Sequence, residues 1–115
     1  MKVYYFSEFP YHEYPDEEAE KYPSLRLTFP NSLFDPNTAT DLFKRYFDEC
    51  QYADELGYHG IMVNEHHTTP SCMNASCNLT AVVLARITKQ AKILLLGNIL
   101  PIHENPVRLA EDVAL

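Results

Sequence analysis

A short, uninterrupted apolar run just after a helix-ending glycine constrains the fold of this chain more than any other feature. Ile61, Met62 and Val63 are continuous apolar residues, and Gly57 stands where a glycine is expected just past a helix end. A strand without polar alternation is typical of a parallel sheet, where both faces of the strand are buried. We therefore expect a buried parallel strand over residues 60–64.

Two further apolar runs and three amphipathic stretches complete an alternating pattern. Strands that alternate with helices are typical of a parallel sheet with helices packed outside it, so the fold class expected is α/β. Thr38, Asn78 and Asn105 are the expected helix caps, and Pro106 suits the first position of the last helix because it lacks an N–H. The expected strands are 3–6, 60–64 and 93–100, and the expected helices are 38–56, 79–90 and 106 onward.

The apolar residues of the first two helices recur at steps of three and four, which predicts one buried face on each. On the first helix the acidic residues are expected mostly off that face. The inward residues of the second helix are expected to be Leu79, Val82, Val83 and Ile87. The acidic residues of the first helix are Asp48, Glu49, Asp54 and Glu55.

Residues 7–37 form a long, proline-rich stretch that also carries several aromatic residues. A stretch of this length without regular structure is uncommon in a compact domain and is usually functional where it occurs. Its aromatic residues favour a lid or a substrate-binding excursion, since linkers are poor in aromatics. The alternative is a mobile surface loop.

Composition limits the remaining classes of function. The net charge of −7 disfavours nucleic-acid binding, because no basic stripe is present to meet phosphates. The N-terminus does not have the form of a secretory signal, and no apolar run reaches transmembrane length. The three cysteines, Cys50, Cys72 and Cys77, fit free thiols in a reducing compartment. We expect a cytoplasmic protein of one domain that does not bind a membrane.

Glu65, His66 and His67 follow the buried strand directly. Ligands of α/β proteins sit outside the carboxyl ends of the strands, so these side chains are candidates for a site. An imidazole there can act as a general base, a hydrogen-bond donor or a ligand. The alternative is a histidine-rich surface loop. Asn98, near the end of the third strand, could face the same ligand or could cap a turn.

A metal site is the competing explanation for the histidines. His66, His67 and His103, with Cys72 and Cys77 nearby in the sequence, would suit a metal-dependent barrel hydrolase. Their spacing matches no zinc pattern, so no metal ligand is assigned. The chain has only three glycines and no glycine-rich phosphate loop, which argues against a Rossmann or P-loop site in this segment.

Three blocks, in order, resemble the bacterial-luciferase-like, flavin-dependent monooxygenases. The first resembles that family's first helix, second strand and Glu-His-His end, and the second resembles its next helix and strand. The third resembles the Pro-Val-Arg-x-Ala-Glu-Asp block that opens its third helix. Together they cover roughly the second half of the chain. The blocks are YADELGYHGIMVNEHH, LARITKQAKILLLGNILP and ENPVRLAEDVAL.

The resemblance implies a (βα)8 TIM barrel, of which residues 1–115 would be the N-terminal portion. The chain would supply the first three βα units and stop in the third helix, with 7–37 as a loop insertion. A reduced FMN at the mouth of the barrel would activate O2 and oxygenate a small organic substrate. His66 would be the catalytic histidine, and Phe6, Glu65, Asn98 and Ile99 would contact the cofactor. The family often has a non-prolyl cis peptide at the position of Asn98 and Ile99.

The resemblance also leaves a related activity open. A deazaflavin-dependent enzyme that transfers hydride, with coenzyme F420, shares the fold. A monooxygenase would depend on a separate flavin reductase and could be a homo-oligomer. On its own, a chain of three βα units would expose both edges of its sheet, so we expect residues 1–115 alone to be inactive and to be unstable or to associate.

Overall fold

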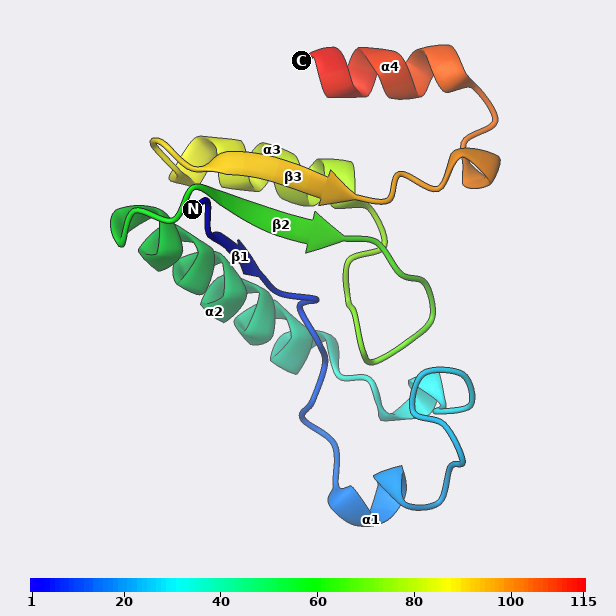
Figure 1. The fold of residues 1–115 in the computed structure, drawn as a ribbon. Coiled ribbons are helices and arrows are strands. Elements are labelled where there is room, and N and C mark those ends of the chain that lie inside the picture. Colours follow the sequence, from blue (N-terminus) through cyan, green and yellow to red (C-terminus); the bar gives the residue numbers. More distant parts are fainter.

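The computed structural model describes all residues from 1 to 115 and confirms an α/β chain. Its three parallel strands lie in the order β1-β2-β3 (Figure 1). The short turns are α1 (Asp16–Ala19) and the 3-10 helices η1 (Asn31–Leu33) and η2 (Leu100–Ile102). The main elements are β1 (Tyr4–Phe6), α2 (Pro36–Glu55), β2 (Gly60–Asn64), α3 (Cys77–Ile87), β3 (Lys92–Leu96) and α4 (Pro106–Ala114).

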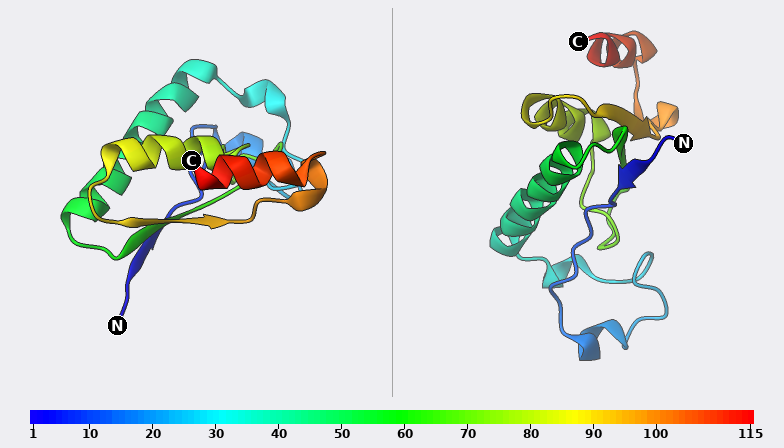
Figure 2. Two further views of the ribbon diagram at one scale, coloured as in Figure 1. Left: turned by 90° about the horizontal axis from the view of Figure 1, so that it is seen from above. Right: turned by 60° about the vertical axis from the view of Figure 1, so that its left-hand side comes forward.

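The central strand β2 has the predicted bounds, but it is packed on one face only, and Met62 on the other face is half-buried. Its side chains at Ile61 and Val63 are fully buried against α2 and α3, which cover one face of the sheet (Figure 2). Phe6, Met62 and Leu94 are aligned across the opposite face, and Phe6 and Leu94 are exposed there. The sheet therefore has one packed face and one open apolar face.

Strand β3 is shorter and more exposed than expected. It ends at Leu96, because Gly97 has a φ of 95° that breaks the extended backbone, and Leu100 lies in η2. Its side chains alternate between half-buried and exposed, because successive side chains point to opposite faces and only one face of the sheet is covered by helices. The apolar run predicted a strand correctly, but the burial on both faces that such a run indicates is not found, since no residue of β3 is fully buried.

Two of the three expected helix caps are wrong. Asp35, rather than Thr38, caps α2: its Oδ2 accepts from the Thr38 N–H at 2.8 Å, and Pro36 occupies the first turn. Helix α3 begins at Cys77, so Asn78 lies inside it. Asn105 does cap α4 as expected, since its Oδ1 accepts from the Val107 N–H at 2.9 Å. Gly57 follows α2 with a φ of 81°, as predicted for a helix end.

The predicted inward face of α3 is only partly correct, since Ile87 packs against the core as expected. Leu79 and Val82 are 71% and 67% exposed, while Thr80 and Leu84 are buried. A threonine can be buried here because its hydroxyl donates to Asn74 Oδ1 at 2.8 Å. Helical periodicity alone favoured the larger apolar residues as the inward ones, because it cannot reveal this hydrogen bond of Thr80.

Asp54 was expected off the packed face of α2, but it is only 2% exposed. Its Oδ2 accepts from the Lys89 N–H at 2.7 Å, and its Oδ1 accepts from Gln90 and Ala91 N–H at 3.1 and 2.6 Å. Burial raises the pKa of this carboxyl, but the hydrogen bonds from the three backbone donors lower it by more. The net effect is a pKa below the ordinary value. Asp54 therefore fastens the α3–β3 connection to the end of α2.

Phe9, in the segment 7–37, belongs to the core. Its ring is fully buried and stacks on Tyr46, with the centroids 5.1 Å apart, and it meets Phe43 and Phe47 edge-on. Phe9 has a φ of 51°, a strained conformation for a bulky residue. The start of the segment is thus anchored in the core rather than being a free loop.

Candidate functional site

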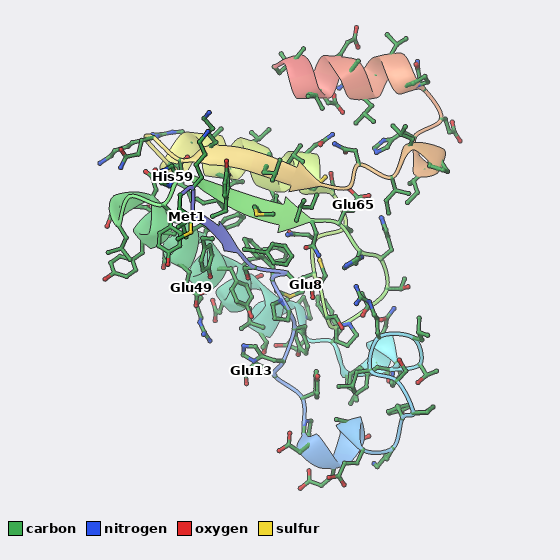
Figure 3. The ribbon with its side chains drawn as sticks, viewed as in Figure 1. Met1, Glu8, Glu13, Glu49, His59 and Glu65 are labelled. Atoms are coloured by element: carbon green, nitrogen blue, oxygen red, sulfur yellow. The ribbon has the colours of Figure 1, made fainter.

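The candidate site lies at the carboxyl end of the sheet. Because the strands are parallel, the residues that follow them meet at one edge: Glu8 after β1, Glu65 and His66 after β2, and Asn98 after β3. Glu8 and Glu65 are visible at this edge in Figure 3. These polar residues follow the strands at one edge of the sheet, as the parallel order requires.

The half-buried His66 is held by a residue from the segment 7–37. Its Nε2 lies 2.6 Å from Arg26 Nη2 and 3.5 Å from Glu8 Oε1. A guanidinium can only donate, so Nε2 accepts in this arrangement, and the neutral ring carries its proton on Nδ1. Arg26 is the nearer partner of Nε2 and fixes the tautomer, while Glu8 Oε1 accepts from Asn64 Nδ2 at 2.8 Å.

The backbone of His66 is fixed as well as its ring. Its N–H donates to the carbonyl of Asn74 at 3.0 Å. Asn64, the last residue of β2, accepts from Cys72 Sγ at 3.5 Å through its other amide atom. The 68–76 connection is thereby attached to the end of β2 and holds the imidazole in place.

Glu65 is buried, and both of its carboxylate oxygens are engaged. Oε2 accepts from the Cys77 N–H at 3.1 Å, at the start of α3, and Oε1 accepts from His67 Nε2 at 3.0 Å. Burial raises the pKa of Glu65, but the bonds from Cys77 and His67 lower it more, and the net direction is down. Glu65 therefore serves as a cap for α3, where Ser76 makes no side-chain cap bond.

Asn98 joins the other side of the same helix start. Its Oδ1 accepts from Cys77 Sγ at 3.5 Å. Burial raises the pKa of the Cys77 thiol to about 11, so this cysteine stays protonated and acts as a donor. Cys77 links Glu65 and Asn98, the residues that follow β2 and β3.

A cavity of about 360 Å³ opens beside His66. Its walls come from the segment 7–37, from α2 and from the 68–76 connection. Backbone bonds join the two connections: Tyr11 N–H donates to Pro70 O at 2.7 Å, and Met73 N–H donates to Phe9 O at 2.9 Å. The structure thus makes the segment 7–37 a wall of this cavity.

The expected site residues are not gathered in one place. His66 lines the 360 Å³ cavity, Phe6 lines a second one with Glu8 and His12, and Asn98 lines a third between α3 and α4. Ile99 lines none of these three cavities. No peptide bond is cis, so the cis peptide expected near Asn98 and Ile99 is not present.

No group of three or more His, Cys, Asp or Glu side chains is arranged to hold a metal ion, so the hydrolase alternative has no ligand set here. None of the helices is both long and apolar enough to span a bilayer.

Arg26 and Glu8 are the residues near His66 that the sequence did not reveal. Arg26 lies in the proline-rich segment, 40 residues away in the chain from the histidine that it contacts. A lone arginine among aromatic residues gives no periodic signal. Glu8 could have been found, because it follows a predicted strand end as Glu65 does.

The residues present fit part of a flavin. Phe6 and Ile99 are 46% and 38% exposed near the ends of β1 and β3, which leaves apolar surface for a flat ring. The polar groups of Glu65 and Asn98 make hydrogen bonds with Cys77, so they are not free to bind a flavin. The five expected site residues include no cation for a phosphate and line no common cavity, so their fit to a flavin is limited to exposed apolar surface for its ring.

Comparison with known proteins gives one match of structure. No protein-family model matches the chain, and no curated protein matches its sequence. The fold is similar to that of a type II Baeyer-Villiger monooxygenase, the oxygenating constituent of 3,6-diketocamphane monooxygenase from the CAM plasmid of Pseudomonas putida, solved in complex with FMN. The TM-score is 0.65 at 18% identity, and the match covers 98% of this chain and 25% of that one. The chain thus has the fold of about a quarter of an FMN-containing monooxygenase.

Proposed function

We propose that the chain is the N-terminal portion of a luciferase-like (βα)8 barrel and that the protein carrying it is a flavin-dependent monooxygenase. It would use reduced FMN and O2 to oxygenate a small organic substrate. The observation that carries the proposal is a neutral histidine, His66, beside an open, mostly apolar cavity at the carboxyl end of the central strand. The fold likeness to an FMN-containing monooxygenase supports it.

In this proposal the flavin supplies the activation of O2, and the chain supplies orientation and proton control. His66 is the catalytic residue, because its Nδ1–H can donate to a developing negative charge on an oxygen atom. Phe6 and Ile99 would pack against the ring. Glu65 and Asn98 would act indirectly, because their hydrogen bonds fix Cys77 and the start of α3.

The experiment uses the full-length protein that contains this chain. Chemically reduced FMN is added, and oxygen uptake and the absorbance of the bound cofactor are followed, with a flavin reductase present in a parallel sample. Binding of FMN with substrate-dependent oxygen uptake is the expected result. Binding of coenzyme F420 without oxygen uptake would refute the monooxygenase and point to hydride transfer on the same fold.

A further inference from the structure

Residues 12–30, which include α1, contribute to the wall of the 360 Å³ cavity but contain no buried residue. In Figure 1 and in the right view of Figure 2, α1 lies apart from both the sheet and α2. The aromatic contacts of the segment are mostly internal, since the ring of Phe29 lies 4.7 Å from that of Tyr14 and 5.4 Å from that of Tyr22. Phe29 and Pro30 line the cavity. The segment can therefore move as a unit, and its movement would uncover the cavity.

Tyr11 fastens both ends of this segment. Its N–H donates to the Pro70 carbonyl at 2.7 Å, which fixes the chain just before residue 12. Its hydroxyl donates to the Leu33 carbonyl at 3.4 Å and accepts from the Asp35 N–H at 3.2 Å, which fixes the chain just after residue 30. The two ends of the segment are therefore held close together at one buried residue, which is the geometry of a hinge.

One polar side-chain contact joins the segment to the body of the chain. The 2.6 Å contact between Arg26 Nη2 and His66 Nε2 is the only side-chain hydrogen bond or ion pair between residues 12–30 and the other residues. General electrostatic attraction does not replace this contact, because both parts of the chain are net negative. Residues 12–30 carry five acidic and two basic side chains, and the other residues carry eleven and seven. The position of the segment therefore depends on whether Nε2 of His66 can accept a hydrogen bond.

The charged groups around His66 determine what a proton on Nε2 would do. Arg26 faces the ring from the segment, and Glu8 Oε1 lies 3.5 Å from Nε2 after the end of β1. No charged side chain of α2 lines the cavity. A proton on Nε2 would remove the acceptor for Arg26, place two cations together and give Glu8 an ion-pair partner. The other titratable neighbours are Glu65 and His67, which pair with each other, and the Cys72 thiol, whose pKa is raised by burial.

We propose that residues 12–30 form a lid over the cavity, hinged at Tyr11, and that Arg26 latches this lid to His66 while the histidine is neutral. Uptake of a proton by His66 releases the lid, because an imidazolium offers a guanidinium no acceptor and carries the same charge. An imidazole ordinarily changes its charge between pH 5 and 8, so the lid is closed above this range and open below it. The inference is independent of the reaction proposed above, since the closed lid needs neither flavin nor O2.

Labelling of Cys72 measures lid opening in the full-length protein without flavin. This thiol lines the cavity and is 2% exposed, whereas Cys50 lies in the core and is 0% exposed, so labelling of Cys50 reports unfolding. N-ethylmaleimide is added at pH 8 and at pH 5.5, and mass spectrometry follows the two labelled peptides separately. Variants are compared with wild type at one pH at a time, so the pH dependence of the thiol reaction cancels.

Two variants separate the latch from the proton that releases it. Arg26→Met removes the donor, and at pH 8 its Cys72 should react about tenfold faster than that of wild type, the factor that one hydrogen bond from a charged donor contributes. His66→Gln supplies a neutral oxygen acceptor near the position of Nε2 at any pH, so at pH 5.5 its Cys72 should react about tenfold more slowly than that of wild type. Lys21→Met, which removes the other cation of the lid, should match wild type at both pH values.

Equal rates at Cys72 in Arg26→Met and wild type at pH 8 would overturn the inference, and so would equal rates in His66→Gln and wild type at pH 5.5. Labelling of Cys72 no faster than that of Cys50 in every variant would also overturn it, because the cavity would then open only on unfolding. A protein that shows the expected labelling rates but takes up no oxygen would lose the proposed reaction and keep the lid.

Discussion

Replacing Asp54 by Asn tests how much the bonds between α2 and the α3–β3 connection contribute to the stability of the fold. The asparagine oxygen can still accept from two of the three backbone N–H groups, but its amide faces the remaining one. An unpaired buried donor costs roughly 1–3 kcal/mol, and the two retained bonds lose the strength that a carboxylate gives them, so the expected loss is about 2–4 kcal/mol. Urea denaturation of the full-length protein at pH 7 measures it.

The pH dependence of this loss of stability provides a second test. The folded pKa of Asp54 lies below its ordinary value of 3.8, so the carboxylate contributes its stability above that value and loses it as the pH falls through the folded pKa. The difference between wild type and Asp54→Asn should therefore shrink in acid. Asp48→Asn, at an exposed site on the same helix, should change stability by less than about 0.5 kcal/mol. If the two variants were equally stable at pH 7, the reasoning would fail.

Three other substitutions are informative in the same protein. His66→Ala should lower turnover by roughly 10²–10⁴-fold with little change in melting temperature, and an unchanged rate would remove His66 from the mechanism. Phe9→Ala should cost about 3–5 kcal/mol in urea denaturation, far more than Phe6→Ala at its exposed site; similar losses would contradict the core placement of Phe9. Gly60→Ala should prevent normal pairing of β2 with β3, because a Cβ would lie 2.5 Å from the Lys92 carbonyl; an unchanged melting temperature would refute that close approach.

The local sequence predicted the elements whose signals are contiguous. Residues 60–64 form a strand with the expected bounds, because an apolar run there is preceded by the helix-ending Gly57 and followed by charged and polar residues. The cap at Asn105 was found because Pro106 follows it directly. In each case the residues that determine the structure are neighbours in the chain.

The features that were missed depend on contacts between distant residues. Asp54 is buried because three N–H groups on the connection before β3 need an acceptor, and helix periodicity cannot reveal that. Phe9 belongs to the core because its segment folds back over α2. Arg26 reaches His66 for the same reason. Strand ends could be read from the sequence, but the residues that the long segment brings to them could not.

The joining of two connections by backbone bonds has a consequence for how proteins of this kind can diverge. Tyr11 and Phe9 are linked to the 68–76 connection through main-chain atoms, which any amino acid supplies. Side chains along the wall, such as Leu33 and Phe34, can therefore be exchanged during evolution while the wall stays attached and the register of the sheet is unchanged. Selection can act on the shape of the pocket separately from the stability of the fold, so descendants that keep His66 and the sheet could acquire new substrates through this one segment.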